Sequence, residues 1–219
     1  MFVKSYCSSI SGIEAVTVAV EVNITAGIGM YLVGLPDNAV RESQERIRAA
    51  FENCEYKMSG KKVVVNLSPA DLRKEGSAYD LPIAVAMLAA SGQIDAAPLS
   101  RYVLLGELSL DGSILPVKGA LPIAMQALKE GFAGIILPKE NAREATVVKG
   151  LDVYGIGNLR EVVNFLQGFT NLTPARINLD ETFTEAQRSF DGDFCDVKGQ
   201  AQVKRALEVA AAGGHNVLM

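Results

Sequence analysis

Short runs of β-branched and apolar residues are the strongest constraint on the fold of this chain. The densest run covers residues 15–24, a second follows at 30–35 after a glycine-rich turn, and both predict strands. Similar runs predict further strands at residues 61–67, 102–108, 134–137 and 152–155. Strands come first and helices then alternate with strands, so the order favours an α+β or α/β layer fold with a mixed sheet.

Helical spacing separates these runs. Asp37 is a suitable N-cap for a helix whose apolar side chains share one face and whose charged side chains cover the other: Val40, Ile47, Phe51 and Cys54 against Arg41, Glu45, Arg48 and Glu52. Further helices are predicted at residues 79–91, 118–129, 141–147 and 159–167. The Asp-Gly pair at 111–112 predicts a hairpin turn.

The charge balance limits how the chain could bind nucleic acid. Among 219 residues the net charge is −4 and the pI is near 5.2, so no overall positive field attracts DNA or an anionic membrane. A local DNA contact is open at two basic pairs, Lys61 with Lys62 and Arg73 with Lys74. Neighbouring glutamates favour the alternative, ordinary solvated surfaces.

Cysteine and histidine usage argues against a metal site. Cys7, Cys54 and Cys195 lie far apart in the sequence, and the single His215 cannot complete a zinc site with them. We expect reduced thiols and no metal ligands. The start of the chain lacks a signal-peptide pattern, and the longest weakly charged stretch, residues 78–97, is too interrupted to span a bilayer. The expected location is therefore cytoplasmic, without membrane contact.

The composition changes after residue 170. Residues 171–192 are polar and contain Pro174, which predicts a linker between a domain at 1–170 and a segment at 193–219. That last segment has a Val-Lys-Gly-Gln turn at 197–200, an alanine-rich helix, a Gly-Gly-His stop at 213–215 and a short apolar strand. Such an order normally leads into a phosphate-binding loop, but no G-x-x-x-x-G-K-[ST] motif follows. We expect a sequence cut before that loop, with no ATP turnover of its own.

The middle of the chain resembles the proteolytic domain of Lon-type proteases. Three segments carry the resemblance: Leu-Pro-Val-Lys-Gly at 115–119, Leu-Pro-Lys-Glu-Asn at 137–141, and the stretch 73–87 from Arg-Lys-Glu-Gly-Ser-Ala to Ala-Met. The resemblance implies an α+β fold of the ribosomal protein S5 domain 2-like, two-layer type with a mixed sheet.

Lon chemistry needs a serine activated by a neutral lysine. The resemblance puts Ala78 at the nucleophile position and Ile123 at the position of the base, so we expect no catalytic residues. Ser77 lies one residue before the first position and Lys118 lies five before the second. A shifted Ser77–Lys118 dyad is the enzymatic alternative, and a loop serine with a solvated lysine is the other.

Over nearly its full length the chain resembles the magnesium-chelatase-like AAA+ ATPases of the ComM (YifB-like) type. Matching motifs occur in order at residues 33–48, 66–76, 80–84, 196–200 and 213–219. The resemblance implies a Lon-like domain without the protease dyad, placed before an AAA+ module that forms a hexamer and moves DNA in natural transformation, recombination or branch migration.

The same resemblance implies the ligands and partners. The full-length protein would use ATP and magnesium, and its partners would be its own AAA+ module, a homo-oligomeric ring and DNA. Val197 and Gly199 would lie beside the adenine, as an incomplete site, so no cofactor is expected for these residues alone. A magnesium chelatase ATPase subunit is the remaining alternative function.

Overall fold

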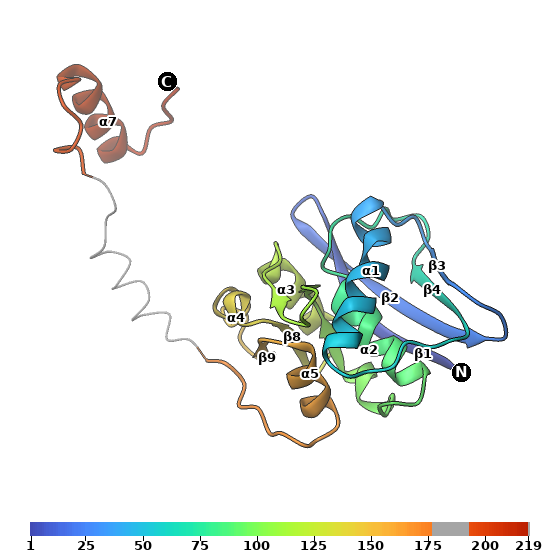
Figure 1. The fold of residues 1–219 in the computed structure, drawn as a ribbon. Coiled ribbons are helices and arrows are strands. Elements are labelled where there is room, and N and C mark those ends of the chain that lie inside the picture. Colours follow the sequence, from blue (N-terminus) through green and yellow to red (C-terminus); the bar gives the residue numbers. More distant parts are fainter. Residues whose placement is uncertain (177–192, 219) are drawn as a thin grey trace. The chain divides into compact units, whose positions relative to one another are not determined.

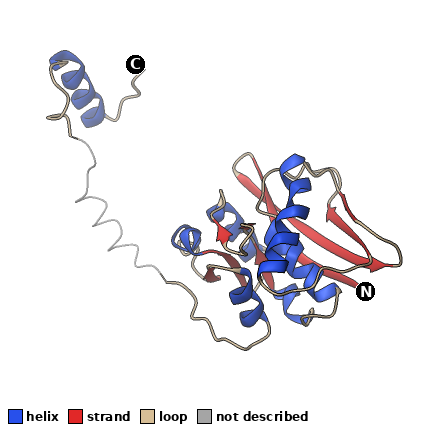
Figure 2. Cartoon of the chain, in the orientation of Figure 1, coloured by secondary structure: helices blue, strands red, loops and turns tan. Residues whose placement is uncertain are grey.

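The computed structural model describes residues 1–176 and 193–218. It contains two compact units, Met1–Ile177 and Asn178–Met219, which we describe separately. The linker predicted at 171–192 falls mostly on residues 177–192, outside the described part. Figures 1 and 2 show the larger unit as a curved sheet with helices packed on it.

The larger unit is built on a seven-stranded sheet with the order β3-β4-β2-β1-β5-β8-β9. A two-stranded hairpin, β6-β7, stands apart from it. Their bounds are β1 Phe2–Ser11, β2 Glu14–Thr25, β3 Met30–Val33, β4 Lys62–Ser68, β5 Tyr102–Leu104, β6 Glu107–Leu108, β7 Ile114–Leu115, β8 Gly134–Pro138 and β9 Asp152–Ile156. Antiparallel pairs join β1, β2 and β4, and parallel pairs join the rest of the large sheet. The sheet is therefore mixed, which confirms the expected α+β class.

Five α-helices and a short 3-10 helix belong to this unit in the described residues. Their bounds are α1 Asn38–Asn53, α2 Asp80–Ala90, η1 Ala97–Arg101, α3 Ala120–Lys129, α4 Lys139–Ala145 and α5 Leu159–Leu166. Helix α1 starts as the sequence predicts, because the Asp37 side chain accepts a hydrogen bond from the Val40 amide at 2.8 Å. Its predicted apolar face is buried.

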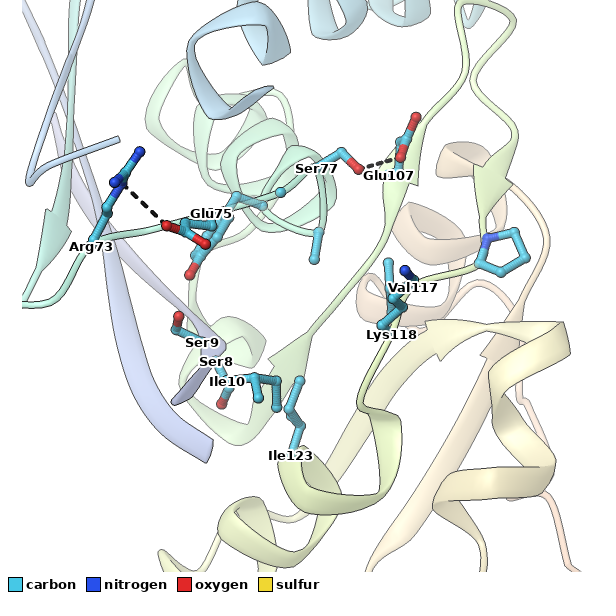
Figure 3. A pocket seen from close by; sticks show the side chains of 14 residues that line it. Ser8, Ser9, Ile10, Arg73, Glu75, Ser77, Glu107, Val117, Lys118 and Ile123 are labelled. Carbon is cyan, nitrogen blue, oxygen red and sulfur yellow. Dashed lines mark hydrogen bonds and ion pairs between the residues drawn. The ribbon is translucent and has the colours of Figure 1, made fainter. Parts of the chain in front are cut away.

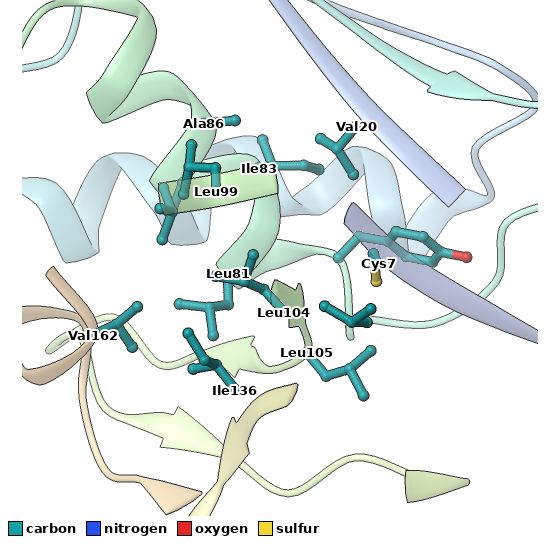
Figure 4. Packing of buried hydrophobic residues seen from close by; sticks show 14 of the residues in the cluster. Cys7, Val20, Leu81, Ile83, Ala86, Leu99, Leu104, Leu105, Ile136 and Val162 are labelled. Atoms are coloured by element: carbon teal, nitrogen blue, oxygen red, sulfur yellow. The ribbon is translucent and has the colours of Figure 1, made fainter. Parts of the chain in front are cut away.

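The core is centred on α2, whose eleven residues are all buried. It contacts β1 and β2 on one side and α1 on another. Figure 4 shows Leu81, Ile83 and Ala86 of this helix among residues from the strands and from α5, such as Leu104 and Val162. A helix that is apolar all round requires this central position, because no side of it can face water without cost.

Helices α2 and α3 lie on opposite faces of β1. Ser5 donates a hydrogen bond to the Pro82 carbonyl in α2 at 3.0 Å, while the next residue, Tyr6, packs edge-on against Phe132 just after α3. Successive side chains of a strand point to opposite faces. The two helices therefore cover different sides of the strand that lines the candidate site.

Three details differ from the sequence predictions. No strand was predicted at β1. The strand predicted at 102–108 is two strands, β5 and β6, separated by Leu105 and Gly106. Helix α3 begins at Ala120, so Lys118 precedes the helix, separated from it by Gly119 with φ +80°.

The smaller unit contains one described helix, α7 Ala201–Gly213. None of the residues of this helix is buried. The turn before it has Gln200 and Gly199 at positive φ. The strand predicted after the Gly-Gly-His stop is wrong for the described residues, since 215–218 form no strand. A strand exists only where its backbone pairs with another, and residues 193–218 contain no second strand.

Candidate functional site

A cavity of about 530 Å3 opens beside the end of β1 (Figure 3). Strands β1 and β5 pair only at Tyr6 and Val103. Beyond that point the chain leaves β1, because the Leu105 amide donates to the Ile136 carbonyl at 2.9 Å and the Gly106 amide donates to the Ala78 carbonyl at 3.1 Å. The cavity fills the space that this separation creates.

Its walls come from four regions of the sequence. They are the end of β1, the loop before α2, strand β6, and the segment from β7 into α3. The lining residues are Ser8, Ser9, Ile10, Arg73, Glu75, Gly76, Ser77, Ala78, Tyr79, Glu107, Pro116, Val117, Lys118 and Ile123.

The cavity lies along the edge of β1 and not over one of its faces. Ser8, Ser9 and Ile10 all line it, although consecutive side chains of a strand point to opposite faces. One cavity can meet all three only from the side of the strand. Because β2 pairs with the other edge along the whole of β1, the cavity occupies the edge that β5 leaves open.

The two residues of the shifted dyad, Ser77 and Lys118, both line this cavity. The Ser77 hydroxyl, however, donates to the carboxylate of Glu107, a residue that the sequence did not single out. Among the described residues no hydrogen bond joins Ser77 to Lys118, whose side chain is exposed. The serine proton is thus directed to a carboxylate and away from the amine.

Ala78 and Ile123 line the same cavity. These are the two positions that the Lon resemblance gives to the nucleophile and the base. A methyl group and a buried isoleucine can neither attack a carbonyl nor accept a proton. The cavity therefore has apolar side chains at both of these positions.

Two buried hydroxyls at the cavity have no hydrogen-bond partner in the described residues, Ser8 Oγ and Tyr79 Oη. Their residues are only 3% and 1% exposed. Burial raises the pKa of Tyr79, so its phenol stays protonated and can donate. Unpaired buried polar groups are costly in a folded protein, so both hydroxyls would gain from a hydrogen-bond partner.

A buried ion pair fixes the loop that forms one wall. Arg46 of α1 meets Asp80 at the start of α2, with Nε 2.6 Å from Oδ2 and a second nitrogen 2.9 Å from Oδ1. The Leu108 amide donates to the same carboxylate at 3.1 Å. Burial raises the pKa of Asp80, and Arg46 opposes that rise. Reasoning from the sequence missed this pair, because Arg46 lies in a run of charged surface residues.

The four candidate DNA contacts do not form one patch. Lys61 and Lys62 lie at the start of β4, whereas Lys74 bridges to Pro36 beyond the far end of the neighbouring β3. A seven-residue strand spans roughly 20 Å. Arg73 is exposed and pairs with Glu75 at 3.2 Å.

Lys74 is not available as a surface contact. It is fully buried, and its amine donates to the Pro69 carbonyl. Burial lowers its pKa. Lys62 is half-buried, with its amine 4.9 Å from the centre of the Tyr31 ring, so the exposed candidates are Lys61 and Arg73.

The candidate adenine contacts belong to the smaller unit. Val197 is 45% exposed, and Gly199 adopts φ +71° in the turn before α7. The Lys204 amine donates to the Val197 carbonyl, which closes this turn. The described residues of this unit thus place Val197 and Gly199 together on one turn and contain no phosphate-binding loop.

Two features are absent from the described residues. No group of three or more His, Cys, Asp or Glu side chains is arranged to hold a metal ion within residues 1–176 and 193–218. Over the same residues no helix has both the length and the apolar character needed to cross a bilayer.

Comparison with known protein families identifies what the chain is related to. A family model described as subunit ChlI of Mg-chelatase matches residues 20–141, more than half of the chain, and a second, described as magnesium chelatase, subunit ChlI, matches residues 193–219. The chain belongs to the ChlI family. The resemblance noted in the sequence motifs is thereby confirmed.

Curated relatives match the ChlI-family chain over nearly its full length. Competence protein ComM of Haemophilus influenzae is 41% identical over 218 residues, which cover 97% of this chain and 42% of ComM. The uncharacterized protein YifB of Escherichia coli is 42% identical over 209 residues, which cover 95% of this chain and 40% of YifB. The chain therefore spans about two fifths of the length of these relatives.

The Lon likeness is weaker and shorter. Lon protease of Brevibacillus choshinensis is 29% identical over 161 residues, which cover 67% of this chain and 20% of that protease. The likeness supports the Lon-like fold.

Proposed function

We propose that this chain is the non-catalytic N-terminal part of a ComM-like AAA+ ATPase, and that it supports a hexameric ring that moves DNA during branch migration, natural transformation or recombination. The observation that carries this proposal is the 41% identity to Competence protein ComM across 97% of the chain. In this proposal residues 1–170 form the Lon-like domain, 171–192 the linker and 193–219 the start of the ATPase module.

The cavity supports the non-catalytic part of the proposal. Apolar side chains occupy both positions that correspond to the Lon nucleophile and base, Ala78 and Ile123. Ser77, the nearest hydroxyl in sequence, donates to Glu107. The domain would then serve the motor by packing on the ring and guiding its substrate.

ATP and magnesium would be bound in the longer protein by the rest of the AAA+ module. Val197 and Gly199 would contribute only the adenine side of that site. The partners would be other copies of the protein in a ring, and DNA, in the cytoplasm. Lys61, Lys62 and Arg73 would be the candidate DNA contacts of the N-terminal domain, while Lys74 is buried.

The test uses the full-length gene product with a synthetic four-way DNA junction. We expect ATP hydrolysis that DNA stimulates, and ATP-dependent conversion of the junction into duplex products. Removing residues 1–170 should leave basal ATP hydrolysis and impair junction conversion. A full-length protein that hydrolyses ATP but never moves the junction contradicts the motor role, and a deletion without effect contradicts the supporting role.

The description of the family favours one second candidate, an ATPase subunit of a magnesium chelatase. The full-length protein would then support insertion of Mg2+ into a porphyrin when mixed with the other chelatase subunits. Magnesium insertion together with an inactive junction assay would favour the chelatase over the DNA motor.

A further inference from the structure

We propose that the cavity beside β1 binds an extended, acidic polypeptide segment and does not cleave it. The proposal does not depend on the DNA motor. The argument combines the open strand edge, the two unpaired hydroxyls and the charges around the cavity.

The open edge selects a polypeptide main chain. After Tyr6, β1 pairs with no further residue of β5, and Ser8, Ser9 and Ile10 beyond that point line the cavity. An extended peptide can add to such an edge through backbone hydrogen bonds. Three residues of strand offer about 10 Å of edge, enough for a short segment.

The buried hydroxyls give the site a reason to be filled. Ser8 and Tyr79 both line the cavity, and neither hydroxyl has a partner among the described residues. A peptide lying along the edge would bring amides and carbonyls to this wall. The unpaired groups would then gain the hydrogen bonds they lack.

The charges select an acidic segment. Arg73 and Glu75 pair with each other at 3.2 Å, and Glu107 accepts the Ser77 hydroxyl. Lys118 has no ion-pair partner in the described part of the chain and stands at the cavity wall. Its amine can bind a carboxylate of the incoming segment. A nucleic acid fits less well than a segment with a single carboxylate at Lys118, because its further phosphates would meet the carboxylates of Glu75 and Glu107.

The experiment measures binding of three fluorescein-labelled, end-capped peptides by anisotropy. The first alternates threonine and valine around one glutamate, the second has lysine in place of the glutamate, and the third has proline in place of two valines. We expect the glutamate peptide to bind about fivefold more tightly than the lysine peptide. The proline peptide should bind about tenfold more weakly than the glutamate peptide, because its two proline residues lack main-chain N–H donors.

Lys118→Glu is the deciding variant, and Lys149→Glu is its matched control, since both lysines are exposed and Lys149 lies outside the cavity. The first should weaken the glutamate peptide about fivefold, and the second should leave it within about twofold. In NMR spectra the amides of Ser8 to Ser11 should shift on adding the glutamate peptide.

Several outcomes would overturn the proposal. One is the absence of binding by all three peptides, and another is equal binding of the glutamate peptide by the Lys118→Glu variant. A third is an oligonucleotide that shifts the Ser8 to Ser11 amides when the peptides do not. Peptide-bond cleavage during the assay would disprove the non-cleaving part.

Discussion

Arg46 and Asp80 form a two-point ion pair between α1 and α2, with Asp80 fully buried and the Arg46 side chain 19% exposed. The pair holds one wall of the cavity in place, because the loop with Ser77 and Ala78 ends where Asp80 begins α2. The Leu108 amide adds β6 to the same carboxylate. Three elements are thus held around one buried charge.

Arg46→Met should therefore destabilise the larger unit strongly. Removing one partner of a buried pair leaves an uncompensated charge, at a cost of about 3 kcal/mol in unfolding free energy near neutral pH. Urea unfolding followed by circular dichroism measures this. Arg48→Met on the exposed face of α1 is the control, with an expected change within about 0.5 kcal/mol.

The deficit of Arg46→Met should depend on pH. Burial raises the pKa of Asp80 above the ordinary value of 3.8, and loss of the guanidinium raises it further. A raised carboxyl pKa in the folded state means that stability is greatest below the unfolded pKa and falls as pH rises through the folded pKa. The variant should thus be closer to wild type at pH 4 than at pH 7, and an equal deficit at both would contradict the assignment.

Ser77→Ala should have no effect on peptide hydrolysis, because we expect none from the wild-type chain. Incubation with fluorescent casein and with unstructured peptides, with a Lon protease as positive control, provides the measurement. Lys118→Ala should likewise have no effect on peptide hydrolysis. Any cleavage that disappears in Ser77→Ala would establish the shifted dyad and refute the non-catalytic proposal.

Thiol reactivity should single out Cys195. Cys7 is fully buried and its pKa is raised to about 12, and burial also raises the pKa of Cys54. Only the thiolate reacts quickly with a disulfide reagent. At pH 8 we expect one fast-reacting thiol in native protein, none in Cys195→Ser and three in urea for the unchanged protein. A second fast thiol in the native state would show that Cys7 or Cys54 is more accessible than described.

Glu21 should lose its stabilising role in acid. Asn66 donates to its carboxylate at 2.9 Å and the Lys4 amine lies 3.1 Å away, and these contacts lower the pKa of Glu21. A lowered carboxyl pKa adds stability that is present above the unfolded pKa and lost as pH falls through the folded pKa. Glu21→Gln should therefore cost less than about 1 kcal/mol at pH 7 and almost nothing near pH 2.5. Glu14→Gln, on the same strand, should be neutral at both.

Local signals predicted a large part of this fold. The N-cap and buried face of α1, the apolar helix α2 and the strands β2, β4 and β8 follow from spacing and residue type, which act within a few residues of the chain. Strand β1 escaped this reasoning. It carries Lys4, Ser5, Ser8 and Ser9, and it is a strand because β2 pairs with it along all ten residues.

The candidate site was predictable only in outline. The motifs placed Ser77, Ala78, Lys118 and Ile123 in corresponding segments, and all four line the cavity. Glu107 could not be foreseen as the partner of Ser77, because their separation in sequence hides a contact made by the fold. Lys74 fails as a surface residue for the same reason, since its main chain pairs with Pro36, which is distant in the sequence.

The early end of β5 has an evolutionary consequence. The opening beside β1 is produced by where the main chain goes after Leu104, and the backbone hydrogen bonds of Leu105 and Gly106 hold it there. Exchanging a reactive side chain at position 78 or 123 changes none of those bonds. A lineage with this backbone could thus lose catalytic activity by two substitutions and still retain the cavity, which could then bind a different ligand.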